Sequence, residues 1–283
     1  MYLSKHQGGN SVSSAEQGDA KDQKRWKKDV LEAYLGVTLK RLFSTGPGAF
    51  DEIYRRLEQF TRSLNEHVGA TAGEGLPAAV VETVTSLAFA IDAKDQYTHG
   101  HSRKVSAYSV MTAQALGLKP EEVEEIRLAG LLHDIGKVGI PEPILNKSGP
   151  LDADEWETMK THTVLGAKIL EPLQTMNRIG DMVRHHHEFY DGTGYPKRLR
   201  GNEIPYGARV IAVADAFDTI TSERTYKKAR TREDAFAELE RCASNQFDPE
   251  IVRAFVKIMR RSPRQVAEPE VEAGSRAPSA TSA

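Results

Sequence analysis

The sequence predicts an all-α protein. Apolar residues recur at intervals of three and four over most of the chain, which is the periodicity of helices with one buried face. The strict alternation that indicates half-buried strands is almost absent. Start and stop signals for helices flank the periodic stretches. With 283 residues, the chain is long enough to bury a sizeable core, as one large domain or two modest ones.

Segments outside the main region differ from it in composition. Residues 1–24 are rich in Ser, Gly, Gln and charge, and residues 263–283 are rich in Pro, Ala, Ser and Glu, so we expect both to be disordered. Residues 25–68 carry two apolar stripes of helical spacing with a Gly-Pro-Gly break between them, which predicts a helical connector or dimerisation element. The Gly-rich residues 69–79 are typical of a linker. The main domain therefore covers residues 80–262.

Helix boundaries in the main domain are marked by residues with a physical reason to be there. Pro120, followed by two glutamates, opens a helix because proline fits the first turn and negative charge suits its positive end. We expect this helix to run to Gly136. Two capping boxes are predicted, Asp152 with Glu155 and Thr231 with Asp234. Further predicted boundaries are Gly117 as a C-terminal cap, a helix from Ala208 to Thr221, and a last helix from Asp248-Pro249.

Charge and cysteine content narrow the class of protein. The net charge of -2 offers no global attraction to nucleic acid or to an anionic membrane, so we expect neither as a partner. The single cysteine, Cys242, excludes an internal disulfide, and its helical surroundings predict an inert core residue. No apolar run approaches the roughly 20 residues that a membrane span needs, and no signal-peptide pattern is present. We therefore expect a cytoplasmic protein without a membrane span.

Short clusters of histidine and aspartate are the most informative feature of the chain. They are His101, His133-Asp134, His162, the run His185-His186-His187, and Asp215. Imidazole nitrogens and carboxylate oxygens are ligands that borderline divalent metals prefer. There are more of these groups than the three or four ligands that one catalytic metal takes, and enough for two ions sharing a bridging carboxylate. That arrangement hydrolyses phosphate esters. Spacing alone does not tell which two of the three adjacent histidines would bind.

The two aspartates lie among apolar residues. Asp134 stands between Leu132 and Ile135, and a buried, unpaired carboxylate would be costly. Lys137 could supply an ordinary ion pair, but we favour metal ligation because so many other ligand types accompany it. Asp215 lies on the apolar stripe of its predicted helix and also needs a cation. Asp218, one turn further, is expected to support a ligand or to join a structural ion pair.

Basic residues on both sides of this region indicate an anionic substrate. The loop of residues 191–196 combines glycines with a tyrosine and is followed by three basic residues. Arg224 and Lys227 follow Asp215. A multiply charged phosphate substrate would require such cations near a metal site. Each basic residue alone is an ordinary surface charge, and the loop alone could be a simple turn.

Taken in order, these motifs resemble the HD-GYP family, bacterial phosphodiesterases of the HD superfamily that open the second messenger cyclic di-GMP. The resemblance covers about residues 80–260. It is carried by Thr98-His99-Gly100-His101, Leu132-His133-Asp134-Ile135-Gly136-Lys137, His186-His187-Glu188, Asp191-Gly192-Thr193-Gly194-Tyr195-Pro196 and Ala214-Asp215-Ala216. Several motifs in register are far more specific than a lone His-Asp pair.

The resemblance implies an HD-domain helical bundle with an extra C-terminal helical part that carries the Gly-Tyr-Pro loop. The metal ligands that it implies are His101, His133, Asp134, His162, His186, His187 and Asp215. Asp134 would bridge the two ions, and Lys137 would contact the scissile phosphate. The other implied substrate-binding residues are Gly194, Tyr195, Pro196, Arg224 and Lys227. The expected reaction is hydrolysis of cyclic di-GMP to linear pGpG, with onward cleavage to GMP left open.

Two departures from the family pattern refine this expectation. Tyr97 stands where members with three metals have a glutamate, so we expect two divalent ions, with iron or manganese favoured. Phe189 stands where arginine is frequent, which puts a local ion pair in doubt. A diguanylate cyclase (GGDEF) domain and a second copy of the chain are expected as partners. The alternatives are another HD-superfamily reaction, such as nucleotide phosphohydrolysis, and a binding module without turnover.

Overall fold

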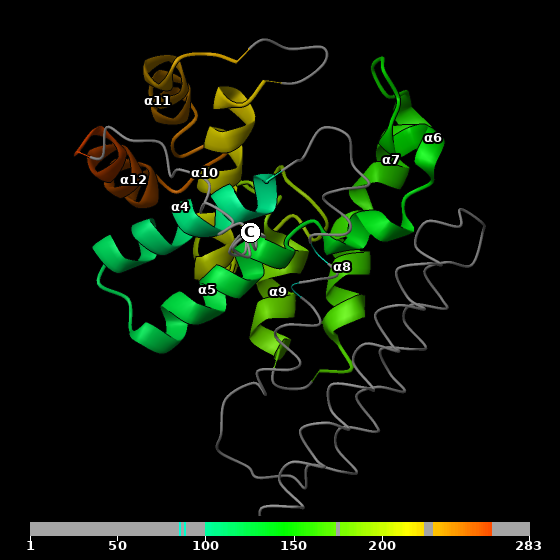
Figure 1. The fold of residues 1–283 in the computed structure, drawn as a ribbon, viewed down its shortest axis with the longest axis horizontal. Helices are drawn as coiled ribbons and strands as arrows, with labels where there is room; N and C mark the ends of the chain where they lie inside the picture. The colour runs from blue at the N-terminus through cyan, green and yellow to red at the C-terminus, as the bar shows by residue number, and fades with distance from the viewer. Residues whose placement is uncertain (1–84, 86–87, 89–99, 174–175, 224–228, 262–283) are drawn as a thin grey trace, which may run out of the picture.

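The computed structural model describes residues 85, 88, 100–173, 176–223 and 229–261, and these form a bundle of helices (Figure 1). These ranges contain no strand; Ala243 and Phe247 form an isolated bridge. The helices are α4 (His101–Ala115), α5 (Pro120–Leu132), η1 (Ile135–Gly139), α6 (Glu142–Leu145), α7 (Ala153–Lys160), α8 (His162–Leu170), α9 (Asn177–His185), η3 (Gly201–Glu203), α10 (Tyr206–Thr221), α11 (Arg232–Arg241) and α12 (Pro249–Arg261). The prediction of an all-α domain is confirmed.

Helix α10 is the central element of the bundle. It packs against α4, α5, α9, α11 and α12, so the early and late helices share one core. Within that core, the ring centroid of Phe217 on α10 lies 5.3 Å from Tyr108, 5.6 Å from Phe236 and 5.1 Å from Phe255. We call these four residues the aromatic core. Burying one phenylalanine contributes about 1.5–3 kcal/mol, so the aromatic core fixes α10 against α4, α11 and α12.

The short helix η1 is pressed against the start of α8. A Cβ added at Gly136 would lie 1.9 Å from the carbonyl oxygen of His162 and 2.5 Å from the amide nitrogen of Gly166. Only glycine fits there. The prediction that the preceding helix runs to Gly136 is wrong, because α5 ends at Leu132 and Gly136 lies within η1. The glycine is needed for this close approach and not to end a helix.

The predicted caps form as the sequence indicates. Asp152 accepts a hydrogen bond from the Glu155 amide at 2.9 Å, and Thr231 accepts one from the Asp234 amide at 3.1 Å. Gly117 follows α4 with a φ of 74°, the left-handed conformation of a C-terminal cap. These local bonds satisfy amides that helix ends would otherwise leave unpaired.

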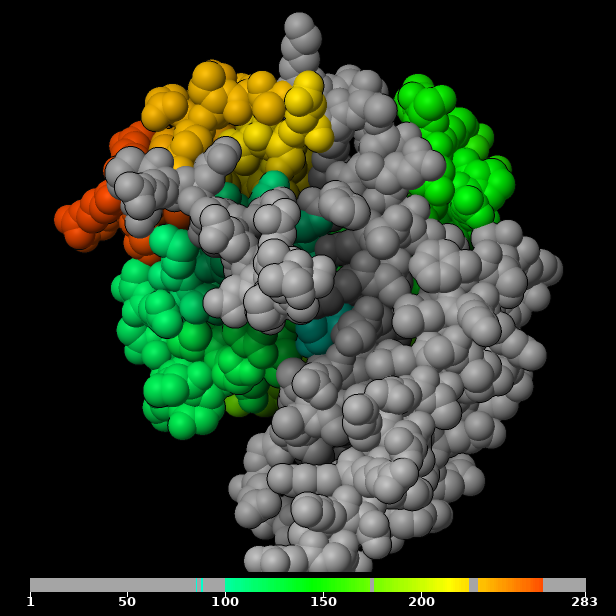
Figure 2. Space-filling model, viewed as in Figure 1, coloured from blue at the N-terminus to red at the C-terminus, as the bar shows by residue number. Residues whose placement is uncertain are grey.

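The remaining sequence predictions have different outcomes. Cys242 is a half-buried free thiol that packs against the core from the end of α11. Within the described part of the chain, no helix is long and apolar enough to cross a membrane. In the space-filling view, α12 and the α6–α7 pair lie at opposite edges of the domain (Figure 2). The segments predicted as disordered, connector and linker lie outside the described residues, namely 1–24, 25–68, 69–79 and 263–283.

Candidate metal centre

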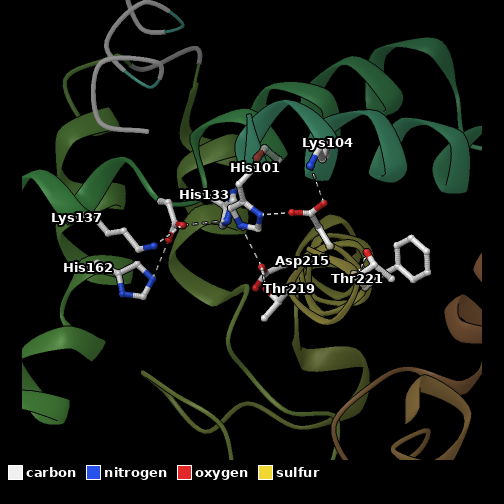
Figure 3. Close-up of polar contacts among 12 residues, drawn as sticks. His101, Lys104, His133, Lys137, His162, Asp215, Thr219 and Thr221 are labelled. Carbon is white, nitrogen blue, oxygen red and sulfur yellow. Dashed lines mark hydrogen bonds and ion pairs between the residues drawn. The ribbon is translucent and has the colours of Figure 1, made fainter. Parts of the chain in front are cut away.

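The seven sequence-predicted ligand residues come together at one place in the bundle. Their ligand atoms form three overlapping groups, within each of which all atoms lie within 4.8 Å of one another. The groups are His162 with His186 and His187, His101 with His133 and Asp215, and His133 with Asp134 and His186. Figure 3 labels His101, His133, His162 and Asp215, with Asp215 below His101 and His133 and with His162 to their left. We call the seven residues the ligand cluster.

The histidines of the cluster come mainly from helix ends. His101 and His162 are the first residues of α4 and α8, while His133 and His186 are the C-terminal caps of α5 and α9. His187 follows directly, and Asp215 projects from the middle of α10. Helix ends converge at this point because α10 packs against α4, α5 and α9, and α8 packs against α9 and η1.

Three imidazoles are oriented by the chain immediately before them. The Nδ1 atoms of His133, His162 and His186 lie 2.7–2.8 Å from the carbonyl oxygens of Gly130, Met159 and Val183. A carbonyl only accepts, so each Nδ1 donates and each Nε2 carries a lone pair. All three Nε2 atoms are buried and have no hydrogen-bond partner among the described residues. Buried acceptors without partners are costly, and a bound metal ion would supply the partner that each of them lacks.

His101 is held between two carboxylates. Its Nδ1 lies 2.7 Å from Asp218 Oδ2, and its Nε2 lies 3.2 Å from Asp215 Oδ1. Burial alone would lower the pKa of His101, but the hydrogen bonds to Asp215 and Asp218 raise it to about 10. Lys104 lies 3.9 Å from the other oxygen of Asp218 (Figure 3). The arrangement of a carboxylate, an imidazole and a further ligand is typical of histidines that bind metals.

Asp134 lies between His133 and His162, which belong to different groups of the ligand cluster. Its Oδ2 lies 3.4 Å from the Nε2 of His133, and its Oδ1 lies 3.6 Å from the Nε2 of His162. Lys137 Nζ lies 2.8 Å from Oδ2, so the simple ion pair considered from the sequence is present as well. The carboxylate of Asp134 therefore faces His133, His162 and Lys137 at once.

The electrostatics of the cluster divide its histidines. Burial alone would lower the pKa of His133, but Asp134 raises it above its usual value, as Asp215 and Asp218 do for His101, so these two rings would release a proton when a metal binds. Burial lowers the pKa of His162, of His186 and of His187, the last to about 3, and these rings are neutral near pH 7. Burial alone would raise the pKa of Asp134 and Asp215. Lys137 and His133 outweigh it at Asp134, and His101 outweighs it at Asp215, so both carboxyls have lowered pKa values. Neutral imidazoles and ionised carboxylates are the forms that bind metals.

The third adjacent histidine faces elsewhere. The Nδ1 of His185 lies 2.9 Å from the Asp181 carbonyl oxygen and 3.2 Å from the Asp181 carboxylate, on its own helix. His185 belongs to none of the three groups. The pair that meets the other ligands is therefore His186 and His187.

The Gly-Tyr-Pro loop is anchored against the cluster by its backbone. A Cβ at Gly194 would lie 2.2 Å from the Phe189 amide nitrogen, so only glycine fits. The Tyr195 amide donates to the His187 carbonyl at 3.1 Å, and its ring centroid lies 5.0 Å from that of His187. The buried Glu188 carboxylate accepts hydrogen bonds from the amides of Lys197 at 2.6 Å and Leu199 at 3.1 Å. These bonds hold Tyr195 beside a cluster histidine.

Sequence reasoning missed two supporting residues. Glu188 received no role, although a buried acid directly after two ligand histidines is a usable signal. Thr219 donates to Asp215 Oδ1 at 3.2 Å, and its spacing of four residues from Asp215 on a helix could have predicted the contact. The predicted substrate-binding residues Arg224 and Lys227 lie outside the described residues.

A hollow adjoins the cluster. It has a volume of about 260 Å³ and is lined by His186, His187 and Asp215, with Phe189, Glu238 and Gln246 also in its wall. Small-molecule sites usually measure about 300–1,000 Å³. The hollow is therefore slightly smaller than a typical small-molecule site.

The bundle and its convergent His-Asp pairs define an HD domain. The family model described as "HD domain" matches residues 86–251, more than half of the chain, and the chain belongs to this family. The recognition made from the motifs is thereby confirmed.

Among curated proteins, the chain is similar to a cyclic di-GMP phosphodiesterase of Thermotoga maritima, with 41% identity over 167 residues, 58% of this chain and 45% of that protein. It is 41% identical over 178 residues to the cyclic di-GMP phosphodiesterase response regulator RpfG of Xanthomonas campestris, covering 62% and 47%. It is 38% identical over 178 residues to 3'3'-cGAMP-specific phosphodiesterase 2 of Vibrio cholerae, covering 62% and 34%. The chain thus spans between about a third and a half of these relatives.

A solved structure agrees with the fold. The crystal structure of a cyclic GMP-AMP specific phosphodiesterase from V. cholerae superposes with a TM-score of 0.51 at 19% identity, covering 64% of this chain and 48% of that chain. At that identity the likeness concerns the fold alone.

Proposed function

We propose that the protein is a metal-dependent phosphodiesterase that hydrolyses cyclic di-GMP to linear pGpG, with slower onward cleavage to GMP. The observation that carries this proposal is the ligand cluster, in which one carboxylate, Asp134, faces two sets of imidazoles. The relatives named for cyclic di-GMP, at 41% identity, support the substrate. The hollow lined by His186, His187 and Asp215 offers space beside the cluster for part of the substrate.

Two divalent ions would be held by the cluster. His101, His133 and Asp215 would hold one, and His162, His186 and His187 the other, with Asp134 shared between them. Mixed imidazole and carboxylate donors suit iron or manganese. When bound, such ions make water a stronger nucleophile near neutral pH and polarise the phosphoryl group.

The protein's own groups would orient the substrate and balance its charge. Lys137 is the cation nearest Asp134 and would donate to a non-bridging phosphate oxygen, stabilising the charge that develops there. Tyr195, held by its backbone bond to His187, would line the entrance with Gly194 and Pro196. Arg224 and Lys227 would bind the substrate's phosphates.

The test is the double substitution His133→Ala and Asp134→Ala in anaerobically purified protein. We expect two metal ions per wild-type chain by elemental analysis, a lower content in the variant, and turnover reduced at least about a thousandfold, since metal-assisted steps contribute several kcal/mol. Products are separated by chromatography after incubation with cyclic di-GMP. Retained circular dichroism shows that the variant is folded. Wild-type turnover in that variant would refute the assignment.

A second substrate is favoured by one observation. Relatives at 38% identity carry the name 3'3'-cGAMP-specific phosphodiesterase. Competition between cyclic di-GMP and 3'3'-cGAMP in one reaction gives the ratio of their kcat/KM values, and a ratio above one for cyclic di-GMP supports the main proposal. The homodimer and the diguanylate cyclase partner stay predictions; residues 25–68, expected to form a connector or dimerisation element, lie outside the described residues.

A further inference from the structure

Helix α7 carries a large aromatic side chain that contributes little to the core. Trp156 is 46% exposed, and α7 buries none of its residues. Only Val164 joins Trp156 as an exposed large hydrophobic side chain among the residues described. A single exposed apolar side chain is common, but tryptophan is among the residues enriched where proteins bind their partners.

A continuous series of rings connects Trp156 with the ligand cluster. The centroids of His162 and His187 lie 5.2 Å apart, those of His187 and Tyr195 lie 5.0 Å apart, and those of Tyr195 and Trp156 lie 6.2 Å apart. The Trp156 and Tyr195 rings meet edge to face at 81°. The series therefore leads from a cluster histidine to the exposed surface in two steps.

The polypeptide also fixes this position. Helix α7 ends at Lys160, and α8 begins two residues later at His162, a cluster histidine. Trp156 and Lys160 are four residues apart and lie on the same face of α7. Trp156 thus lies six residues before the cluster histidine His162.

A cation accompanies the rings. Lys160 Nζ lies 5.8 Å from the centroid of the Tyr195 ring, within the range of a cation–π contact. The same atom lies 2.6 Å from Glu157, an ion pair whose glutamate is 70% exposed. An aromatic face with an ammonium beside it matches a nucleotide, because the base stacks on the ring while the phosphate attracts the cation.

We propose that Trp156, Tyr195 and Lys160 form a stacking surface for one purine base of the cyclic dinucleotide, with Lys160 attracting a phosphate. This inference rests on the proposed function, since it assigns part of that substrate to α7. Trp156 makes the stacking contact and Lys160 the charge contact. The alternative is that Trp156 merely supports the Tyr195 loop.

Binding is tested by fluorescence on the full-length, metal-loaded protein. The chain has two tryptophans, so Trp26→Phe leaves Trp156 as the single reporter. GMP, which carries a base, is expected to quench Trp156 in a saturable way, whereas inorganic phosphate leaves its emission unchanged. Equal responses to both, or no response to either, overturn the proposal. This titration needs no turnover, so it decides the stacking surface even if wild-type protein fails to hydrolyse cyclic di-GMP.

Kinetic measurements distinguish stacking of a base on Trp156 from support of the Tyr195 loop by Trp156. Trp156→Leu keeps an apolar contact for Tyr195 but removes the extended ring, and we expect KM for cyclic di-GMP to rise about tenfold with kcat within about twofold. Trp156→Phe is expected to restore most of the affinity. Val164→Ala, an exposed apolar position on α8, is the matched control and should behave like wild type. A wild-type KM for Trp156→Leu, or an equal loss in both Leu and Phe variants, would contradict the assignment.

Lys160 is tested separately. Lys160→Gln should raise KM for cyclic di-GMP about threefold at low salt, with the effect shrinking as salt screens the charge. Lys257→Gln, an exposed lysine on α12, is the control and should change nothing. A salt-independent or absent effect at Lys160 removes its phosphate contact from the proposal.

Discussion

The imidazoles of the ligand cluster come mostly from helix ends, whereas the rings of the aromatic core come from within their helices. His101 begins α4 and His133 caps α5, while Phe217 and Phe255 lie inside α10 and α12. Rings from within helices pack against one another and need nothing else. The helix ends bring together imidazoles, three of which, on His133, His162 and His186, have a buried Nε2 without a hydrogen bond among the described residues. The core is therefore complete by itself, and the cluster is completed by a ligand.

The aromatic core is tested by the substitution with the largest expected effect on stability. Phe236→Ala removes a ring that is 1% exposed and stacks on Phe217. We expect the free energy of unfolding to fall by about 3–5 kcal/mol, from lost burial and the cavity left behind. Urea unfolding of metal-free protein measures this. The folded fraction should still bind metal with wild-type affinity; a matching loss of affinity would show that the two regions are not independent.

Gly136→Ala tests whether the packing of η1 against α8 positions the ligand cluster. The new methyl group would meet the His162 carbonyl oxygen at 1.9 Å, so α8 and η1 must move apart. We expect a loss of about 1–3 kcal/mol in stability from overpacking, together with weaker metal binding as His162 moves relative to Asp134. Urea unfolding and chelator competition give the two numbers.

Gly149→Ala is the matched control for Gly136, because nothing lies within 4 Å of a Cβ added there. It should leave metal affinity unchanged. Equal behaviour of the two variants would mean that the contact of η1 with α8 does not position the ligands.

The smallest expected effect on the fold comes from Asp218→Asn. The substitution keeps the shape of the side chain next to His101 Nδ1 but removes its charge. Loss of such a supporting carboxylate typically weakens metal binding about 10- to 100-fold. Chelator competition measures the change. Wild-type affinity in this variant would mean that the negative charge of Asp218 does not contribute to metal binding through His101.

Much of the fold could be predicted from the sequence because its signals are local. The capping boxes at Asp152 and Thr231, and the start of the last helix at Pro249, depend on contacts within one turn. Gly136 could not be assigned from its neighbours, because the reason for a glycine there is the His162 carbonyl on another helix.

For the site, residue types identified the ligand residues but spacing did not select among them. The choice between His185 and His187 depends on where α9 ends and which way the chain then turns, and the resemblance supplied it before any geometry did. Glu188 accepts a hydrogen bond from the amide of Lys197 in the loop that follows, and the role proposed for Trp156 depends on its contact with Tyr195. Such contacts across the fold leave no periodic trace in the sequence.

The carbonyl contacts of His133, His162 and His186 have a further consequence. Each ring is tied to the residue three positions before it, so its direction travels with its own stretch of chain. A segment that detaches from the bundle keeps the orientation of its imidazole as long as this hydrogen bond to the carbonyl persists. Metal release should therefore accompany the separation of helices. When the helices pack together again, the ligand histidines should not need to change rotamer.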